Sequence, residues 1–216
     1  MRLVLLGAPG SGKGTQAQRM QARHGVPQVS TGDLLREAVA AGTELGRAAQ
    51  IVMQAGGLVA DDIMLGIIRE RLTRPDAARG FILDGFPRTQ AQADGLAALL
   101  KNLGTPIDTV VLMEIDPEVL LRRVAGRRSC RRCGRVFHIE TNPPRPGERC
   151  EDGKEHDLFQ RPDDNEATVR QRLAVYRERT QPLIEHYARL GLLRRIDANG
   201  TLDEVDARLK AAIAAG

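Results

Sequence analysis

Residues 2–15 read RLVLLGAPGSGKGT and join a short apolar run to a loop with four glycines and one lysine. Residues 2–6 have the length and character of a buried strand, and residues 16–23 are good helix formers. Between them, residues 7–13 match the pattern G-x-x-x-x-G-K. Glycines let backbone N–H groups approach an anion, and a helix N-terminus adds the positive end of its dipole. Strand, loop and helix together predict a phosphate-binding loop.

The loop departs from the usual pattern at one position. Lys13 supplies the charge expected beside the β- and γ-phosphates of a nucleotide. The Ser or Thr that usually follows this lysine is replaced by Gly14, and a hydroxyl comes one residue later, at Thr15. The Mg²⁺ contact usually made by that hydroxyl therefore cannot be assigned to residue 14. A plain glycine turn is the alternative, but the lysine and the flanking elements favour a phosphate site.

The bulk composition excludes several classes of function. Of 216 residues, 42% are hydrophobic but only 3% are aromatic, so we expect one or two domains with an aliphatic core. The net charge of +4 is small and aromatics are scarce, which argues against nucleic acid as a partner. Apolar runs of 18 residues and a signal-peptide pattern are both lacking, and three cysteines are an odd number for a disulfide framework. We therefore expect a cytoplasmic protein with no membrane partner.

Apolar runs of strand length alternate with helical patterns along the rest of the chain. This alternation predicts a doubly wound parallel α/β sheet, whose ligands bind beyond the carboxyl ends of the strands. Lys13, Thr31 and Asp84 all fall at such ends. Besides residues 2–6 and 16–23, we expect strands near residues 25–30, 80–85, 109–115 and 192–197, and helices near residues 34–42, 44–54, 63–72, 89–100, 117–128, 165–189 and 202–212.

A compositional change marks an insert. Residues 129–164 are rich in Pro, Gly, Cys and charged side chains, and residues 135–139 alternate as a strand does. We expect this segment to form a small β-rich unit.

A second candidate phosphate site lies at residues 84–88, which read DGFPR. A carboxylate at a strand end beside an anion site, here Asp84, usually supports Mg²⁺ directly or through water. Arg88 can bind a phosphate through two parallel hydrogen bonds. A lone arginine is more often a solvated surface charge, but the preceding Phe86 and Pro87 restrict the backbone at this position.

Taken together, these residues resemble an adenylate kinase of the longer bacterial type, which carries an inserted lid. The resemblance covers essentially the whole chain, and it rests on residues 7–15, 30–36, 84–88, 126–128 and 160–164 and on Gln92. It implies a P-loop core of about five parallel strands with two mobile parts, an α-helical AMP-binding segment and the lid. The implied division is residues 1–29, 60–126 and 165–216 for the core, 30–59 for the AMP-binding segment and 127–164 for the lid.

The resemblance also implies the site residues. ATP would be held by Gly10, Ser11, Gly12, Lys13, Gly14, Thr15, Arg123, Arg127, Phe137 and Gly200. AMP would be held by Thr31, Arg36, Met53, Val59, Gly85, Arg88, Gln92, Arg161 and Arg172. The catalytic set would be Lys13, Asp84, Arg88, Arg123, Arg161 and Arg172. Asp84 would support Mg²⁺ through its waters, and Asp163 and Asp164 would orient the lid arginines.

The implied reaction is reversible in-line transfer of a phosphoryl group from MgATP to AMP, which gives two ADP and serves adenine-nucleotide homeostasis. Such a transfer depends on positioning, on charge stabilisation and on a closed site that excludes water. The expected partners are ATP, AMP and ADP, and the family implies a monomer.

Two alternatives remain open. One is a UMP or CMP kinase of the same fold. Thr31 and Gln92 favour AMP, because pyrimidine kinases of this fold commonly have Ala at the position of Thr31. The other is a non-catalytic sensor that binds ATP, which the complete set of lysine and arginines disfavours.

The three cysteines predict a metal site. Cys130 and Cys133 are two residues apart and Cys150 follows in the same insert, a spacing that suits tetrahedral Zn²⁺. The alternative is three reduced cysteines without metal. A zinc ion in the lid would be structural, because so small a unit lacks a core of its own.

The fourth zinc ligand is ambiguous. Zinc-binding lids of the family end in Cys or Asp, whereas the matching residue here is Gly153. We expect Asp152 to take this role, with His156 next and Asp157 as a further candidate. His138 lies in the alternating piece, and we expect it to be structural.

Overall fold

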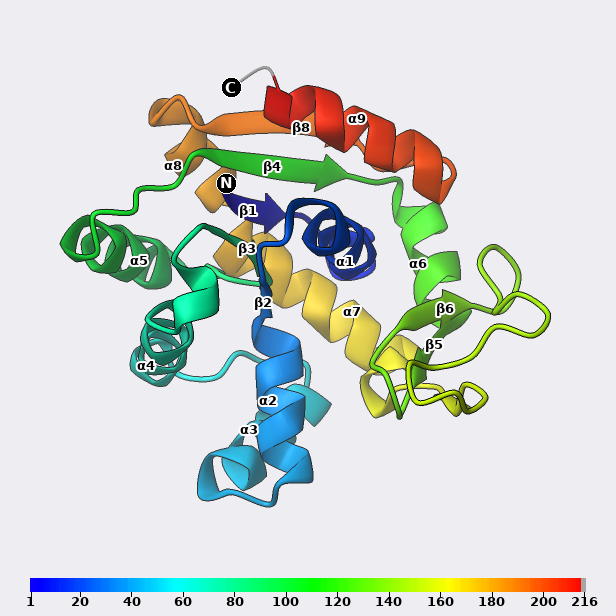
Figure 1. The fold of residues 1–216 in the computed structure, drawn as a ribbon. Coiled ribbons are helices and arrows are strands. Elements are labelled where there is room, and N and C mark those ends of the chain that lie inside the picture. Colours follow the sequence, from blue (N-terminus) through cyan, green and yellow to red (C-terminus); the bar gives the residue numbers. More distant parts are fainter. Residues whose placement is uncertain (215–216) are drawn as a thin grey trace.

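The structure is a computed structural model that describes residues 1–214, and its centre is a five-stranded sheet (Figure 1). The strand order is β2–β3–β1–β4–β8, and every neighbouring pair is parallel. This confirms the predicted doubly wound parallel sheet. The strands are β1 (Arg2–Leu6), β2 (Gln28–Ser30), β3 (Phe81–Asp84), β4 (Thr109–Glu114) and β8 (Leu193–Asp197).

Helices cover both faces of this sheet. The helices of the described chain are α1 (Lys13–His24), α2 (Thr31–Ala40), α3 (Glu44–Gln54), α4 (Asp61–Leu72), α5 (Gln90–Asn102), α6 (Pro117–Ala125), α7 (Glu166–Val175), α8 (Leu183–Arg189) and α9 (Leu202–Ala214), with short 3₁₀ turns η1 (Pro75–Ala77) and η2 (Pro162–Asp164). Among residues 1–214, no helix has the length and apolar character needed to cross a membrane.

Alternate strand residues enter two separate cores, as expected for side chains that alternate along a strand. The face covered by α4, α5 and α8 receives Val4, Leu6, Leu83, Val110 and Leu112. The face covered by α1 and α9 receives Leu3, Leu5, Ile82, Val111 and Met113. The second core is aliphatic as expected, whereas the first also contains Phe81, Phe86 and Tyr187.

The strand register brings the predicted site to one edge of the sheet. Asp84 at the end of β3 pairs with Leu5 of β1 on one side and with Ser30 of β2 on the other. The glycine loop after β1, the start of α2 after β2 and the loop after β3 therefore meet at the carboxyl ends of the strands.

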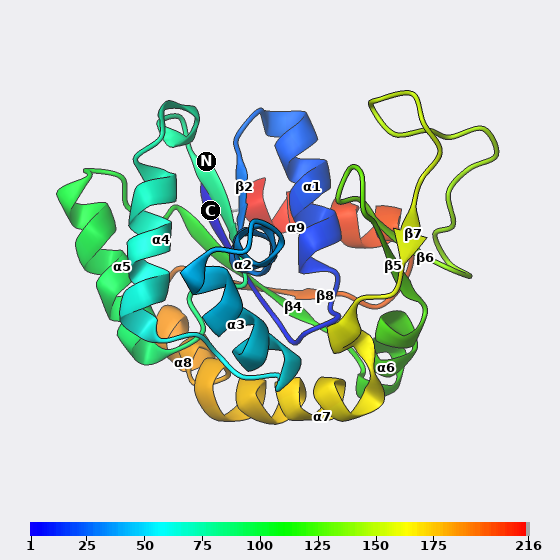
Figure 2. The same cartoon turned by 90° about the horizontal axis from the view of Figure 1, so that it is seen from below.

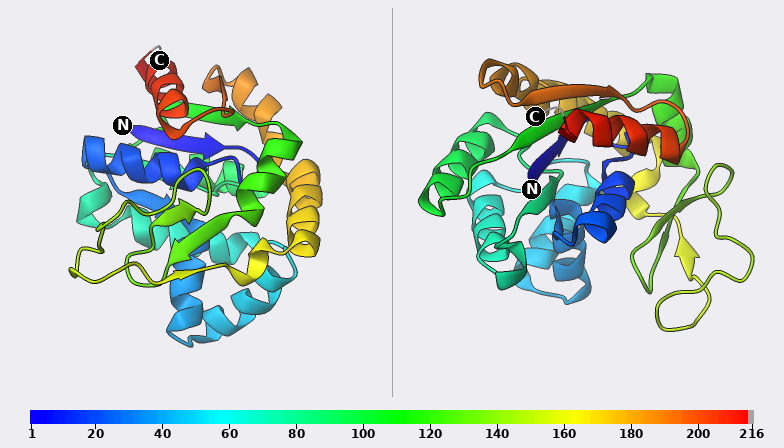
Figure 3. Two further views of the ribbon diagram at one scale, coloured as in Figure 1. Left: turned by 90° about the vertical axis from the view of Figure 1, so that its right-hand side faces the viewer. Right: turned by 45° about the horizontal axis from the view of Figure 1, so that its top comes forward.

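Two parts project from the core (Figure 3). One is the α2–α3 pair, in which a Cβ at Gly46 would lie 2.0 Å from Ala38 O. The glycine thus lets the two helices approach closely. The other is an antiparallel sheet in the order β6–β5–β7, built from β5 (Arg127–Cys130), β6 (Val136–His138) and β7 (Leu158–Phe159). This confirms the predicted β-rich insert.

The long helix expected at residues 165–189 is interrupted, and in this respect the prediction is wrong. After α7 the backbone widens into a π-helical turn, η3 (Tyr176–Thr180), in which Gln181 N donates to Tyr176 O over 2.8 Å. Pro182 follows and then α8 begins. Proline lacks an N–H and its ring crowds the carbonyl four residues earlier, which explains the interruption. In Figure 2, α7 runs from α6 towards α8 along the lower edge of the molecule.

Candidate active site

A cleft of about 1470 Å³ opens between the sheet edge, the α2–α3 pair and the small antiparallel sheet. With the exception of Ser11, which is buried, every residue predicted to contact a nucleotide lines it. These residues are Gly10, Gly12, Lys13, Gly14, Thr15, Thr31, Arg36, Met53, Val59, Asp84, Gly85, Arg88, Gln92, Arg123, Arg127, Phe137, Arg161, Arg172 and Gly200. The fold thus brings together side chains that are far apart in the sequence.

The glycine loop forms one end of the cleft. Gly10 has φ +94° and Gly12 has φ +95°, left-handed values that favour glycine. A Cβ at Gly10 would also lie 2.6 Å from Val124 Cγ2. These glycines therefore allow a loop conformation that suits the binding of phosphate by backbone N–H groups.

Lys13 is the first residue of α1 and turns back over the loop. Its Nζ donates to Gly7 O over 2.7 Å and to Ala8 O over 2.9 Å. Burial lowers the pKa of Lys13 to about 8, although the charge of Asp84 raises it. Lys13 is thus mainly cationic at neutral pH and holds only neutral acceptors, so a phosphate would be a stronger partner.

Gly14, which replaces the expected hydroxyl residue, lies against Asp84. A Cβ at residue 14 would come 3.2 Å from Asp84 Oδ2, and this oxygen also accepts a hydrogen bond of 3.1 Å from Gln28 Nε2. A larger residue would therefore crowd the carboxylate. Burial raises the pKa of Asp84, whereas the charge of Lys13 lowers it. The carboxylate thus lies in an environment that would favour a further cation beside it.

Arg88 and Thr31 converge on one backbone carbonyl at the opposite end of the cleft. Arg88 Nε donates to Gly85 O over 2.7 Å, and Thr31 Oγ1 donates to the same oxygen over 2.8 Å. Gly85 has φ +76°, and a Cβ there would lie 2.8 Å from Arg88 Nη2. Burial, followed by the charge of Arg172, lowers the pKa of Arg88 to about 10, so it remains a cation at neutral pH.

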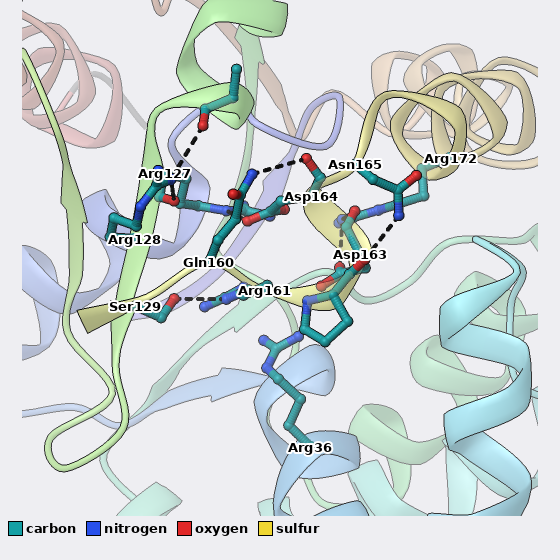
Figure 4. Close-up of polar contacts among 12 residues, drawn as sticks. Arg36, Arg127, Arg128, Ser129, Gln160, Arg161, Asp163, Asp164, Asn165 and Arg172 are labelled. Atoms are coloured by element: carbon teal, nitrogen blue, oxygen red, sulfur yellow. Dashed lines mark hydrogen bonds and ion pairs between the residues drawn. The ribbon is translucent and has the colours of Figure 1, made fainter. Parts of the chain in front are cut away.

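Acidic residues orient the arginines at the base of the small sheet (Figure 4). Arg127 Nε donates to Asp164 Oδ2 over 2.9 Å, and the Asp164 side chain is fully buried. Arg172 Nη1 donates to Asp163 Oδ2 over 2.6 Å. Asp164 thus pairs with Arg127 of the segment expected to form the lid, whereas Asp163 pairs with Arg172 of α7, outside that segment.

Arg161 lies between the two ends of the cleft without a carboxylate partner among the described residues. Its Nε donates to Ser129 Oγ over 2.8 Å. Figure 4 shows the Arg36 side chain, which is paired with Asp33, pointing towards it. Burial, then the charges of Arg36 and Arg127, lower the pKa of Arg161 to about 10. The mutual repulsion of these cations suits a site that receives several phosphate groups.

Arg123 connects the glycine loop with the loop before α9. Its Nη2 donates to Gly200 O over 3.0 Å, and its Nη1 lies 3.5 Å from Ser11 O. The guanidinium therefore lies where a nucleotide on the glycine loop would pass.

Two further residues form hydrogen bonds to residues of the site but were not predicted from the sequence. Gln28 bonds Asp84, as described above, and Asp61 bonds Gln92 Nε2 over 2.7 Å. A polar residue within the short apolar strand β2 was the available signal for Gln28. For Asp61 no sequence signal existed, because it lies in the first turn of α4, where acidic residues are common.

Three cysteines and one histidine form a cluster in the small sheet. Their ligand atoms all lie within 4.8 Å of one another, and the members are Cys130, Cys133, Cys150 and His156. The Sγ atoms of Cys130 and Cys150 are 3.5 Å apart, and His156 Nδ1 is 3.2 Å from Cys150 Sγ and 3.6 Å from Cys133 Sγ. Ligands of a tetrahedral Zn²⁺ ion are about 3.3–3.8 Å apart. The set therefore fits zinc.

The structure brings His156, not Asp152, to the cysteines. The Asp152 carboxylate instead accepts a hydrogen bond from Lys154 N over 3.0 Å and faces Arg132. The turn at residues 150–153, closed by a hydrogen bond from Gly153 N to Cys150 O, carries Asp152 away and returns the chain at His156. His138 lies outside the cluster, where its Nδ1 accepts hydrogen bonds from the backbone of Glu140 and Thr141.

Comparison with known proteins shows which family this chain resembles over most of its length. The model of the adenylate kinase family matches residues 5–192. The adenylate kinase of Nitrosococcus oceani is 51% identical over 95% of this chain and 94% of its own length. That of Archaeoglobus fulgidus is 50% identical over 94% of this chain and 92% of its own length. That of Syntrophotalea carbinolica is 48% identical over the full length of both chains.

Proposed function

The chain belongs to the adenylate kinase family, and we propose that Lys13 and Arg88 hold the phosphates of the two nucleotides between which it transfers a phosphoryl group. The reaction is reversible: MgATP and AMP give two ADP, which balances the adenine nucleotides of the cell. The observation that carries the proposal is that both cations line one cleft, with Arg161 and Arg172 in the same lining.

On the ATP side, the glycine loop and Lys13 bind the β- and γ-phosphates, and Arg123 and Gly200 lie beside the nucleoside. Phe137 and Arg127 approach from the small sheet, which serves as the lid. Mg²⁺, when bound with ATP, neutralises phosphate charge. Asp84 fits a role beside that ion, because its half-buried carboxylate lies at the glycine loop with Lys13 as its cationic neighbour.

On the AMP side, Arg88 and Arg36 bind the phosphate, and Thr31, Val59 and Gln92 surround the base. The reaction needs no covalent intermediate with the protein. The arginines align donor and acceptor and spread the charge of the phosphoryl group as it moves. Exclusion of water prevents hydrolysis of ATP and requires the lid and the α2–α3 pair to close over the cleft.

The division into a core, an AMP-binding segment at residues 30–59 and a lid at residues 127–164 is part of this proposal. It is supported by the two projections seen in Figure 3. We also propose that the enzyme acts as a monomer in the cytoplasm, since two moving parts leave little rigid surface for a large interface. Sedimentation velocity at micromolar concentration tests the monomer, and a dimer would contradict it.

Arg88→Ala tests the assignment of the phosphate sites. We expect kcat/KM for AMP to fall at least about 100-fold, because a charge-assisted bidentate contact to phosphate is lost. The Kd for ATP, measured without AMP, should stay within about twofold. Arg69→Ala, an exposed arginine on α4, is the matched control and should retain wild-type values. Near-normal kcat/KM for AMP in the Arg88 variant would overturn the assignment.

A parallel assay with AMP, CMP and UMP as acceptors tests the choice of substrate. AMP should give the highest kcat/KM. Preference for a pyrimidine nucleotide would instead favour the alternative kinase.

We propose that the lid binds one structural Zn²⁺ through Cys130, Cys133, Cys150 and His156. Three thiolates and one imidazole are a ligand set that zinc prefers. Binding would tie the loop that carries Cys150 to β5, in a unit whose own core is very small.

Metal content and thermal unfolding test the zinc site. Stripped and reloaded wild-type protein should hold about one zinc per chain, and removal should lower the Tm of the lid. His156→Ala should bind zinc at least about tenfold more weakly, whereas Asp152→Ala should match the wild type. If Asp152→Ala loses the metal and His156→Ala keeps it, Asp152 is the ligand. If wild-type protein binds no zinc, the site is not a metal site.

A further inference from the structure

The side-chain amide of Gln92 is held on both of its sides. Gln92 is only 2% exposed and lies in the first turn of α5. Its Oε1 accepts a hydrogen bond of 2.8 Å from Arg88 N, and its Nε2 donates one of 2.7 Å to Asp61 Oδ1. The α4–α5 packing that brings Asp61 to Gln92 is visible in Figure 2.

The two partners fix which end of the amide is which. A backbone N–H can only donate and a carboxylate can only accept, so the oxygen must face Arg88 and the nitrogen must face Asp61. If the amide turned over, Nε2 would face the Arg88 N–H and Oε1 would face the Asp61 carboxylate. Both contacts would then be repulsive. The Arg88 N–H and the Asp61 carboxylate therefore strongly favour one orientation of the Gln92 amide over the turned-over one.

A fixed amide can distinguish two kinds of base. After these two bonds, Gln92 keeps one N–H and one oxygen lone pair. Adenine offers a donor at N6 beside an acceptor at N1, whereas a 6-oxo purine offers an acceptor at O6 beside a donor at N1. The two edges are the reverse of each other, so an amide that matches one must turn over to match the other. The base itself could not turn over in place of the amide, because the phosphate of the same nucleotide would be anchored at Arg88.

We propose that Asp61 is a specificity-determining residue, which selects 6-amino over 6-oxo purine nucleotides as acceptors by locking the Gln92 amide. The cleft lining includes Gln92 but not Asp61, so Asp61 acts through Gln92 as a positioning residue. The inference rests on the proposed placement of the AMP base beside Gln92. Asp61 supplies the repulsive contact that makes the turned-over amide unfavourable.

Asp61→Asn provides the sharpest test, because an asparagine of the same shape can present either its oxygen or its NH₂ to Gln92. We expect the ratio of kcat/KM for IMP to kcat/KM for AMP to rise about tenfold, since one of two mismatched hydrogen bonds in the turned-over amide is relieved. Asp61→Ala should shift the ratio in the same direction by less. Asp62→Asn removes an equal charge from the same helical turn at an exposed position and should keep the wild-type ratio.

A purely structural role for Asp61 would lower both kcat/KM values together. An unchanged ratio in both Asp61 variants, with AMP activity lost in Gln92→Ala, would overturn this inference and leave the proposed function intact. Wild-type kcat/KM for AMP in Gln92→Ala would overturn the placement of the base and, with it, the role of Asp61. Failure of the wild-type protein to phosphorylate AMP would instead overturn the proposed function.

Discussion

At the scale of single residues, the pKa of Lys13 is set by its surroundings. Burial lowers its pKa to about 8, and its hydrogen-bond acceptors in the loop are carbonyls and a hydroxyl. Nucleotide phosphates would bring negative charge and raise this pKa on binding. The protonation of Lys13 is therefore coupled to the binding of ATP.

We predict that ATP affinity falls above pH 8. Below the free-state pKa, Lys13 is already protonated and binding needs no proton. Above it, binding must restore the proton, so the affinity falls by up to about tenfold for each pH unit until the pKa of the complex is reached. Calorimetric titration with MgATP between pH 7.5 and 9.5, in buffers of different ionisation heat, should show proton uptake at the higher pH.

The control for Lys13 is an arginine at the same position. Lys13→Arg keeps its charge throughout this pH range, so its ATP affinity should be nearly constant with pH, even if weaker. Equal pH dependence in the variant and the wild type would mean that another group is responsible.

The glycine loop, the DGFPR segment and the arginines that line the cleft could be recognised in the sequence because each is a local signal. The sequence could not explain Gly14, because the contact with Asp84 arises only from the register of β1 with β3. It favoured Asp152 over His156, because the path of the loop after Cys150 depends on a turn that residue spacing alone does not specify.

At the scale of the elements, the junction between α6 and the lid is closely packed. Gly126 ends α6, and a Cβ there would lie 2.2 Å from His138 Nε2. The same ring nitrogen lies 3.3 Å from Arg122 O, and Ile139 N donates to Gly126 O over 3.0 Å. The lid strand β6 is thus joined to the last turn of a core helix by side-chain and backbone contacts together.

We predict that Gly126→Ala destabilises the protein by about 1–3 kcal/mol, because the added methyl displaces the His138 ring and overpacking costs this much. Gly66→Ala is the matched control. Gly66 lies within α4 with open space around its Cβ position, so alanine should stabilise by about 0.5–1 kcal/mol. Urea unfolding measures the free energy of unfolding of both variants. An unchanged stability of Gly126→Ala would contradict the prediction and show that the His138 ring moves without cost.

Element boundaries followed the sequence well where periodicity and capping agreed. The predicted helix at residues 44–54 coincides with α3, whose Thr43 cap accepts a hydrogen bond from Gly46 N. The predicted helix at residues 165–189 was wrong from Tyr176 onward, where a π-helical turn and then Pro182 interrupt it. A proline inside a helical pattern was the signal that should have divided it.

At the scale of the whole molecule, the cleft brings together cations from three parts that are separate in space. Lys13, Arg36 and Arg123 come from α1, α2 and α6, Arg88 follows β3, Arg127 begins β5 and Arg161 follows β7. Burial lowers the pKa of Arg161 most, and the charges of Arg36 and Arg127 lower it further, so these cations repel one another. Phosphate groups would remove this repulsion, so ligand binding and closure of the parts should be coupled.

We predict that ATP and AMP, when both are bound, stabilise the protein cooperatively. At about 100 times its Kd, a single ligand contributes about 2.7 kcal/mol, or a rise in Tm of roughly 5–11 °C for a chain of this size. AMP together with a non-hydrolysable ATP analogue should raise Tm by at least about 2 °C more than the sum of the two separate shifts, because Arg161 and Arg172 then bind phosphates of both ligands.

In Arg161→Ala, with ligands scaled to its own Kd values, this excess should shrink towards zero while the separate shifts remain. Strictly additive shifts in the wild type, measured by differential scanning calorimetry, would show that the two sites fill independently and that these arginines do not link them.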